Sequence, residues 1–288
     1  MKRLFPVILI LLLLLSGCGG EDVAETTAPG ETVPPTYSND GPEGVLDENV
    51  PTTVYKLVRM VSLDDKGLEQ WHREYFYDAS GFLTGEMEVS STGTVTYRKS
   101  NTPNEAGLVA ASDVTEAGGL SYIVTYEYDE KGNVTLQQSK TDGTVTDYIE
   151  YTYDDHGNYL TLKQSYAGEL VADYVFSYTY NEKGSQLTRE ETFFGELACR
   201  VEMTYDDQGR EISSVSLGAD GKEQSRTESA WEGLTETRKY FALGEAQPYM
   251  TSVITYDDHG NVILEENQYA DGTVTMMEYT YEPFEVIK

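Results

Sequence analysis

The stretch Tyr151-Thr-Tyr-Asp-Asp-His-Gly-Asn158 decides how this chain folds, because close variants of it return along the sequence. Three of these variants begin at Tyr126, Tyr178 and Ile254. Each one joins an alternating run of Tyr with Thr or Glu to a turn with an Asp or Asn and a Gly. Alternation with a period of two that ends in such a turn is typical of a β-hairpin. The sequence therefore predicts a single hairpin design that is repeated in tandem.

The glycines of these turns mark a regular repeat along the chain. Eight of them, two in degenerate copies, lie 24 to 27 residues apart: Gly81, Gly107, Gly132, Gly157, Gly184, Gly209, Gly233 and Gly260. A second series of turns falls between them, at Gly67, Gly93, Gly119, Gly143, Gly168, Gly195, Gly221, Gly244 and Gly272. Turn signals every 11 to 16 residues predict an antiparallel meander of about 16 or 17 strands.

The two series of turns differ in their chemistry. In the first series, the Asp can accept hydrogen bonds from backbone N–H groups, and the Gly supplies a positive φ after a type I turn. This predicts a bulged three-residue loop. In the second series, the pairs Asp142-Gly143, Asp220-Gly221 and Asp271-Gly272 suit two-residue type I′ turns.

The strands between the turns have one apolar and one polar face. Tyr and aliphatic residues alternate with Thr, Ser, Glu and Gln, as in the run Tyr122 to Tyr128. After the turn, Val134 with Leu136, and Val262 with Leu264, are expected to continue the apolar series. A sheet with one apolar face must cover it, and the sequence predicts no helix after residue 53. We therefore expect an all-β domain whose sheet curls into a barrel, a shell or a coiled layer.

The repeat residues receive structural roles in this interpretation. The Tyr side chains face the core, the Asp side chains cap the turns, and the Gly residues take a positive φ. The residues assigned in this way are Tyr126, Tyr128, Asp129, Gly132, Tyr151, Tyr153, Asp154, Gly157, Tyr178, Tyr180, Gly184, Tyr205, Asp206, Gly209, Tyr256, Asp257 and Gly260. His156 and His259 occupy a turn position that Lys or Gln fills in other repeats, so they are expected to point into solvent.

The amino-terminal residues 1–17 have the features of a signal peptide that is cleaved. A basic start is followed by an apolar run of about a dozen residues, which is too short to span a bilayer comfortably. The run ends in Leu15-Ser16-Gly17-Cys18, which resembles the lipobox of bacterial lipoproteins. The resemblance implies that Cys18 is acylated and anchors the chain to the cell membrane or outer membrane, facing away from the cytoplasm. An ordinary secretory peptide with a chance Cys is the alternative.

Residues 18–52 are predicted to be a disordered linker, and residues 53–288 the repeat domain. The linker holds eight acidic residues, five Pro and no Lys or Arg, so it cannot bury enough apolar surface to fold. As a flexible coil it would reach roughly 30 Å. Cys199 alternates in step with apolar neighbours and is expected to be a small buried residue. With Cys18 acylated, no internal disulfide is expected.

The tandem motif resembles the YD repeat of the Rhs and teneurin proteins. The likeness is carried by Tyr-x-Tyr-Asp-x-x-Gly-Asn at residues 126–133 and 151–158, with Tyr256-Asp257 and Gly260-Asn261 in a further copy. It covers roughly residues 54–282. The resemblance implies a strip of β-hairpins that spirals into a shell. About eight repeats and a lipid anchor depart from the large toxin shells of that family.

Composition and motifs limit the function. A formal net charge of -30 argues against nucleic-acid binding. We find no catalytic, nucleotide or metal motif, so we expect no enzyme activity, cofactor or metal. Acidic turns leave Ca²⁺ binding open, and exposed Tyr rows could grip a partner. The expected function is an envelope-anchored binding or scaffold module for a protein or a glycan. The alternatives are a secreted hydrolase of envelope polymer with a carboxylate pair, and an outer-membrane barrel, which a Tyr-rich face argues against.

Overall fold

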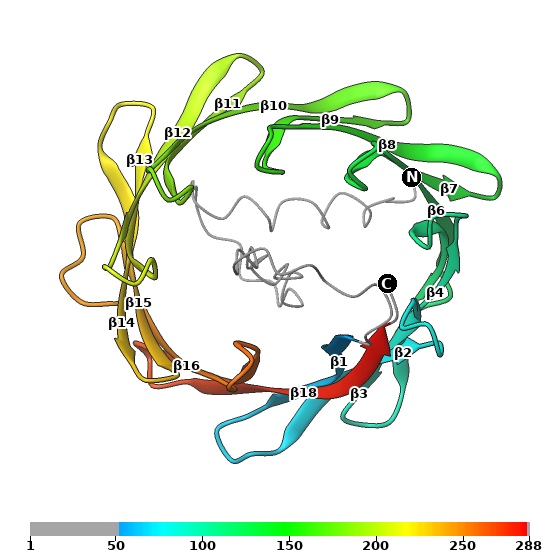
Figure 1. The fold of residues 1–288 in the computed structure, drawn as a ribbon, viewed down its shortest axis with the longest axis horizontal. Helices are drawn as coiled ribbons and strands as arrows, with labels where there is room; N and C mark the ends of the chain where they lie inside the picture. The colour runs from blue at the N-terminus through cyan, green and yellow to red at the C-terminus, as the bar shows by residue number, and fades with distance from the viewer. Residues whose placement is uncertain (1–51, 287–288) are drawn as a thin grey trace, which may run out of the picture.

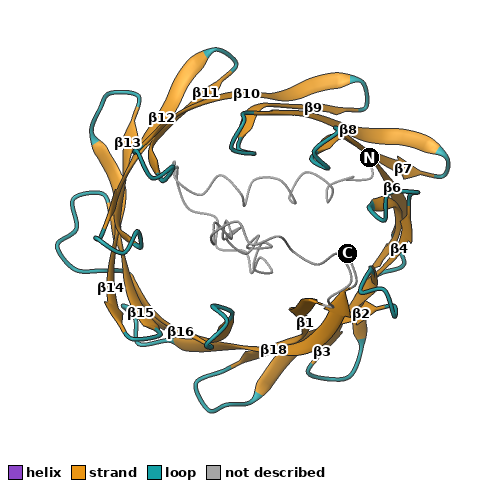
Figure 2. Ribbon diagram, in the orientation of Figure 1, coloured by secondary structure: helices purple, strands orange, loops and turns teal. Residues whose placement is uncertain are grey.

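The computed structural model describes residues 52–286. The predicted signal peptide, Cys18 and nearly all of the linker lie outside these residues. The described chain consists of β-strands joined by turns (Figure 2). The strands are β1 (Thr52–Leu63), β2 (Glu69–Tyr77), β3 (Leu83–Ser90), β4 (Val95–Pro103), β5 (Val109–Glu116), β6 (Ser121–Tyr128), β7 (Val134–Thr141), β8 (Thr144–Tyr153), β9 (Tyr159–Tyr166), β10 (Glu169–Tyr180), β11 (Gln186–Phe193), β12 (Glu196–Tyr205), β13 (Glu211–Gly218), β14 (Glu223–Glu232), β15 (Thr235–Ala242), β16 (Met250–Tyr256), β17 (Val262–Tyr269) and β18 (Val274–Val286).

The strands form one closed ring. Every strand pairs antiparallel with the next along the chain, and β1 also pairs with β18, from Thr52 opposite Val286 to Leu63 opposite Met276 (Figure 1). The predicted antiparallel meander is confirmed, and among its expected forms the structure shows the barrel. The strip closes on itself instead of spiralling. The count of 18 strands exceeds the expected 16 or 17, because 17 turns separate 18 strands.

The face that carries the repeated Tyr residues, here called the Tyr face, is the crowded one. Eleven of the 13 buried hydrophobic side chains lie on it, the exceptions being Val61 and Phe241. Ile149, Tyr151, Leu162 and Phe176 form its most buried cluster. The opposite face, here called the Thr face, leaves Ile123, Val175 and Val253 between 37% and 46% exposed. The strand alternation seen in the sequence therefore separates a packed face from a solvated one.

β-Bulges interrupt the alternation after most of the turns, and two of them contradict the predicted apolar series. Tyr128 lies opposite Val134, but Glu127 lies opposite Leu136, so one residue between Val134 and Leu136 is extra. The bulge moves Leu136 to the Thr face, opposite Glu150. Leu264 is moved in the same way and lies opposite Glu278. These leucines do not continue the apolar series, because a single inserted residue reverses a side-chain period of two.

The second series of turns also differs in part from the prediction. Asp142-Gly143 has positive φ at both residues, 51° and 76°, as a type I′ turn requires. Asp220 and Asp271 are absent from the positive-φ residues, and only the Gly that follows each of them takes such a value. In both turns the Gly N–H donates to the carbonyl three residues earlier, at 2.9 Å. The type I′ expectation is therefore wrong for these two, because their loops are longer than two residues.

The ring has two different rims. The acidic rim holds the turns after the even-numbered strands, together with the start of β1 and the end of β18. Its turns expose Glu105, Glu130, Asp155, Glu182, Asp207, Glu232 and Asp258. The far rim holds the turns after the odd-numbered strands. It also exposes acids, among them Asp65, Asp142, Glu196 and Asp220. In addition it exposes large apolar side chains, including Leu68 (60%), Leu170 (48%), Phe194 (49%), Leu243 (58%) and Tyr249 (48%).

Cys199 is fully buried on the Tyr face, which agrees with its expected packing role. Its sulfur is bonded in a disulfide. This bond differs from the expectation that the chain has no internal disulfide.

Candidate functional site

The Asp of each first-series turn holds its loop closed. Asp129 Oδ1 accepts the backbone N–H groups of Lys131 and Asn133, both at 2.9 Å. Its Oδ2 accepts the Asn133 side-chain amide at 2.9 Å. The Asn133 side chain, followed by its backbone N–H, lowers the pKa of Asp129 below its usual value. The same pair of backbone bonds recurs at Asp78, Asn104, Asp154, Asn181, Asp206 and Asp257.

These carboxylates are therefore committed to their own turns. Asn104 and Asn181 make the same bonds without a charge, so the turn needs an acceptor and not an anion. Within residues 52–286 no three acidic, His or Cys side chains come together in a way that could hold a metal ion. The Gly that closes each turn has a φ of 82° at residues 209 and 260 and 87° at Gly132. At Gly157 an added Cβ would meet nothing within 4 Å. Glycine is needed there because the backbone has a positive φ, and not because space is short.

A row of tyrosine hydroxyls joins several hairpins to the hairpin before them. Tyr128 donates to the Val109 carbonyl and Tyr153 to the Val134 carbonyl, both at 2.7 Å. Tyr205 donates in the same way to Gln186, at 2.7 Å. Each acceptor is the residue just before a bulge. A bulge disrupts the local ladder of backbone hydrogen bonds, and the hydroxyl supplies a donor at that place.

Two repeats fill this role with another residue. In the degenerate repeat around Gly233, Trp231 Nε1 donates to the Glu211 carbonyl at 3.3 Å. In the repeat around Gly184, the Tyr178 hydroxyl donates to the Tyr159 carbonyl at 2.8 Å. Tyr180 is thereby free to donate to the Asp154 carboxylate, and burial together with this carboxylate raises the pKa of Tyr180 to about 12. The sequence carried a signal for the row, namely an aromatic donor just before most of these turns, but no signal for its acceptor.

The two turn histidines are exposed, as expected, but each ring also stacks on a tyrosine. The His156 ring stacks on Tyr180 of the next hairpin, with 4.1 Å between the ring centroids. The His259 ring stacks on Tyr55 of β1, at 4.0 Å. His72, on β2, lies with its Nδ1 2.6 Å from Glu69 Oε1. The two turn histidines therefore contribute to contacts between neighbouring strands or turns, whereas the His72 contact lies within β2.

We predict that Tyr153→Phe destabilises the barrel by about 1–2 kcal/mol, because it leaves the Val134 carbonyl without its hydroxyl donor. Urea unfolding followed by circular dichroism measures the change. Tyr269→Phe is the matched control, since its hydroxyl has no hydrogen-bond partner among the described residues. Equal stability of the two variants would show that the hydroxyl row does not stabilise the ring.

The most enclosed charged group on the Tyr face is Glu236, which is 1% exposed. Its Oε1 accepts hydrogen bonds from Ser229 Oγ at 2.6 Å and Arg238 Nε at 2.8 Å. Its Oε2 accepts from a second guanidinium nitrogen of Arg238 at 3.1 Å and from the Tyr256 hydroxyl at 3.0 Å. Both carboxylate oxygens are thus shared between a cation and a hydroxyl. We describe these four residues as the Glu236 cluster.

Glu236 and nearby Glu211 are candidates for the carboxylate pair that a hydrolase would need. Burial raises the pKa of nearby Glu211, while Arg238 lowers it and Glu236 raises it. Two carboxylates with different environments are the pattern of an acid and a base. However, Glu236 is enclosed by four donors and by the sheet, so its oxygens do not face a substrate. The cluster is built as a structural network.

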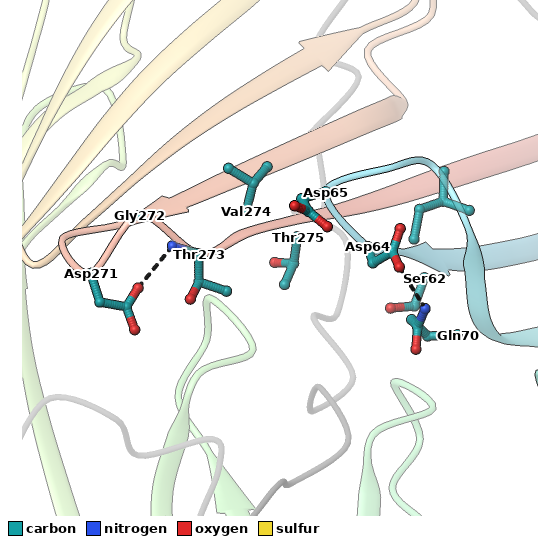
Figure 3. A pocket seen from close by; sticks show the side chains of 10 residues that line it. Ser62, Asp64, Asp65, Gln70, Asp271, Gly272, Thr273, Val274 and Thr275 are labelled. Carbon is teal, nitrogen blue, oxygen red and sulfur yellow. Dashed lines mark hydrogen bonds between the residues drawn. The ribbon is translucent and has the colours of Figure 1, made fainter.

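An open groove lies where the ring closes. The turn after β1 brings Asp64, Asp65 and Gln70 to one side, and the turn between β17 and β18 brings Asp271 and Thr273 to the other (Figure 3). Its volume is about 520 Å³. Asp64 Oδ2 accepts from Gln70 Nε2 at 3.2 Å, and Asp271 Oδ1 accepts from the Thr273 N–H at 2.8 Å. These acids again serve their own turns.

The Thr face carries charges at mid-strand positions. Glu150 lies opposite Lys163, and Glu202 and Glu278 stand exposed on the same face. An Arg or Lys at the centre of a lipid-facing wall costs roughly 2–4 kcal/mol, and an acid somewhat less. The Thr face therefore lacks the continuous apolar band of such a wall. Separately, the part of the chain that the structure describes contains no helix long and apolar enough to cross a membrane.

Comparisons with known proteins give structural neighbours only. No protein-family model matches the chain, and no curated protein does. A Tc holotoxin pore structure of Photorhabdus luminescens matches with a TM-score of 0.33, 13% identity, and coverage of 74% of this chain and 14% of that chain. The complex TcdB2-TccC3 matches with a TM-score of 0.28 and 11% identity, over 80% of this chain and 19% of that chain. A porin-like protein from Bacteroides uniformis matches with a TM-score of 0.30 and 13% identity, over 65% of this chain and 97% of that chain. This chain thus spans under a fifth of the two toxin chains.

Proposed function

We propose that this repeat β-barrel is a non-catalytic scaffold that is anchored in the cell envelope through acylated Cys18 and binds a protein or glycan of the envelope with its far rim. The observation that carries the proposal is the group of exposed large apolar side chains on the far rim. The described chain enters and leaves at the acidic rim, since Thr52 pairs with Val286 there. An anchor attached before residue 52 would therefore hold the acidic rim towards the lipid surface and present the far rim to partners.

The charge of the barrel affects its distance from the lipid surface. Residues 52–286 contain 42 Asp and Glu against 17 Lys and Arg, a net charge of -25. Anionic headgroups repel such a surface within about a Debye length, which is roughly 8 Å at physiological salt. The acidic rim would therefore stay clear of the bilayer on its linker. The far rim could then meet a partner without competition from lipid.

Phe194 is the strongest candidate contact on the far rim. It is 49% exposed and has a φ of 48°, a left-handed conformation that costs a residue with a Cβ roughly 1–2 kcal/mol. Its ring packs on Phe193 at 4.7 Å between centroids. The equivalent turns hold the small or polar residues Asp142 and Ala167. A strained and exposed aromatic residue that adds little to the core is typical of a binding anchor.

We predict that Phe194→Gly folds as stably as the parent, or by up to about 1 kcal/mol more stably, but loses its envelope partner. Glycine accepts the positive φ without strain, and the exposed ring is removed. Pull-down from envelope extracts and a glycan array measure binding, and thermal unfolding measures stability. Ala167→Gly is the control, because it relieves the same strain at the neighbouring hairpin and leaves Phe194 in place. A partner that binds the parent and Phe194→Gly equally would contradict this assignment.

The anchor has its own test. Mass spectrometry of the mature protein should show an acylated Cys18 at the amino terminus, and Cys18→Ser should release the barrel into aqueous buffer. A Cys18 that is unmodified or bonded to Cys199 in the mature protein would overturn the anchoring part of the proposal. It would leave the far rim as a binding surface of a secreted protein.

A further inference from the structure

A hollow of about 210 Å³ opens on the Tyr face over β11 to β14. It exists because small hydroxyl side chains stand where other strands carry Tyr or aliphatic residues. Ser216 lies between Val201 and Ser225 on its neighbouring strands, and Ser214 lies between Met203 and Thr227. These hydroxyls form one side of the hollow, and the apolar side chains Val201 and Met203 adjoin them.

Arg189 also lines this hollow. It lies on β11 opposite Tyr178 and Val201, and therefore on the Tyr face. Its Nε is buried and has no hydrogen-bond partner. No carboxylate among the described residues lies within ion-pair distance of it, although the barrel holds 42 acids. Arg73 and Arg200 also have a buried Nε without a hydrogen-bond partner, but both of those guanidinium groups are ion-paired. Arg189 differs because its guanidinium has no carboxylate partner among the described residues.

The nearest acid on the same strand does not fill this role. Glu191 lies two residues beyond Arg189 on the same face, is 3% exposed, and has an unpartnered Oε2. Burial raises the pKa of Glu191, although the Arg189 charge opposes this. Arg189 and Glu191 thus lie close enough to influence each other without forming an ion pair. The guanidinium fork stays available to an external anion.

We propose that this hollow binds one carboxylated sugar unit, such as a hexuronate residue of an acidic polysaccharide. A planar guanidinium pairs with a carboxylate through two parallel hydrogen bonds, which a hydroxyl-only ligand cannot reproduce. The Ser and Thr hydroxyls match the hydroxyl groups of a sugar, and Val201 and Met203 match its C–H face. The volume lies below the range of about 300–1,000 Å³ for drug-sized ligands, which suits a single unit. This site goes beyond the proposed function, since it lies apart from Phe194 and does not require the anchor.

The test is a titration of the purified barrel with glucuronate, glucose and acetate, followed by calorimetry or NMR. We expect glucuronate to bind, and glucose and acetate to bind far more weakly. Arg189→Gln should weaken glucuronate binding about ten- to hundred-fold. Arg200→Gln is the control, because Arg200 is paired with Glu190 and Glu202 on the Thr face. Unchanged binding by Arg189→Gln, or no binding by the parent, would overturn the proposal.

Two further variants sharpen the result. Ser214→Val keeps Arg189 but fills the hollow, so it should also abolish glucuronate binding while circular dichroism reports an intact sheet. If acetate binds as tightly as glucuronate, the sugar assignment is wrong and the site recognises a carboxylate alone. Phe194→Gly should bind glucuronate like the parent. Glucuronate binding by Phe194→Gly therefore tests this site independently of the far-rim proposal.

Discussion

Glu236→Ala is expected to destabilise the barrel by about 3 kcal/mol. Removing one partner of a buried ion pair costs about 3–5 kcal/mol, because the other charge is left uncompensated. The Arg238 side chain is 36% exposed, so water can partly solvate its guanidinium and the low end of that range applies. The substitution also removes the acceptor for the Ser229 and Tyr256 hydroxyls. Urea unfolding at neutral pH measures the loss.

Glu236→Gln is the matched control for this prediction. It keeps the size of the side chain and one carbonyl acceptor but removes the charge, so we expect a smaller loss of about 1–2 kcal/mol. Polysaccharide or peptidoglycan hydrolysis by the parent that both variants abolish, without a loss of stability, would show that the Glu236 cluster is catalytic. A stability loss without any such activity in the parent would support its structural role.

Ile149→Ala should destabilise the barrel by about 2–5 kcal/mol, the usual cost of emptying a packed aliphatic site. Ile149 is 2% exposed and belongs to the central cluster of the Tyr face with Tyr151, Leu162 and Phe176. A single sheet without a second layer cannot easily collapse into the space that is left. Thermal or urea unfolding of the two proteins measures the difference.

Ile123→Ala provides the comparison on the opposite face. Ile123 is 44% exposed on the neighbouring hairpin, so its replacement removes strand propensity but little packing, and we expect a loss of at most about 1 kcal/mol. The difference between the two substitutions isolates burial from propensity. If both cost the same, the Tyr face is not the packed face in solution.

The sequence allowed the architecture to be predicted because each local signal repeats. The Gly positions placed nearly every turn, and the Asp side chains accept the backbone N–H groups that the turn chemistry requires. Alternation identified the packed face correctly from Tyr122 to Tyr128. Eight copies of one pattern reduce the ambiguity that a single hairpin would leave.

What the sequence did not predict depends on contacts between repeats. Leu136 looked like a continuation of the apolar series, because a bulge leaves no clear mark in an alternating run. The hydroxyl row could not be foreseen, since its acceptors are backbone carbonyls 19 or 20 residues away, such as Val134 for Tyr153. Arg189 gave no signal either, because its lack of a partner depends on three neighbouring strands. Closure also depends on the ends of the sheet, where β1 meets β18.

The seam between β1 and β18 has a consequence for how the chain could be reconnected. Both ends of the described chain meet at one rim, and the strands that carry them are already hydrogen-bonded neighbours. A short loop could join them without crossing the ring, and a new break could be placed at any acidic-rim turn, such as the one at Gly157. Every strand pair would survive such a circular permutation. In this ring, the order of the hairpins around the wall matters to the fold, and the place where translation begins does not.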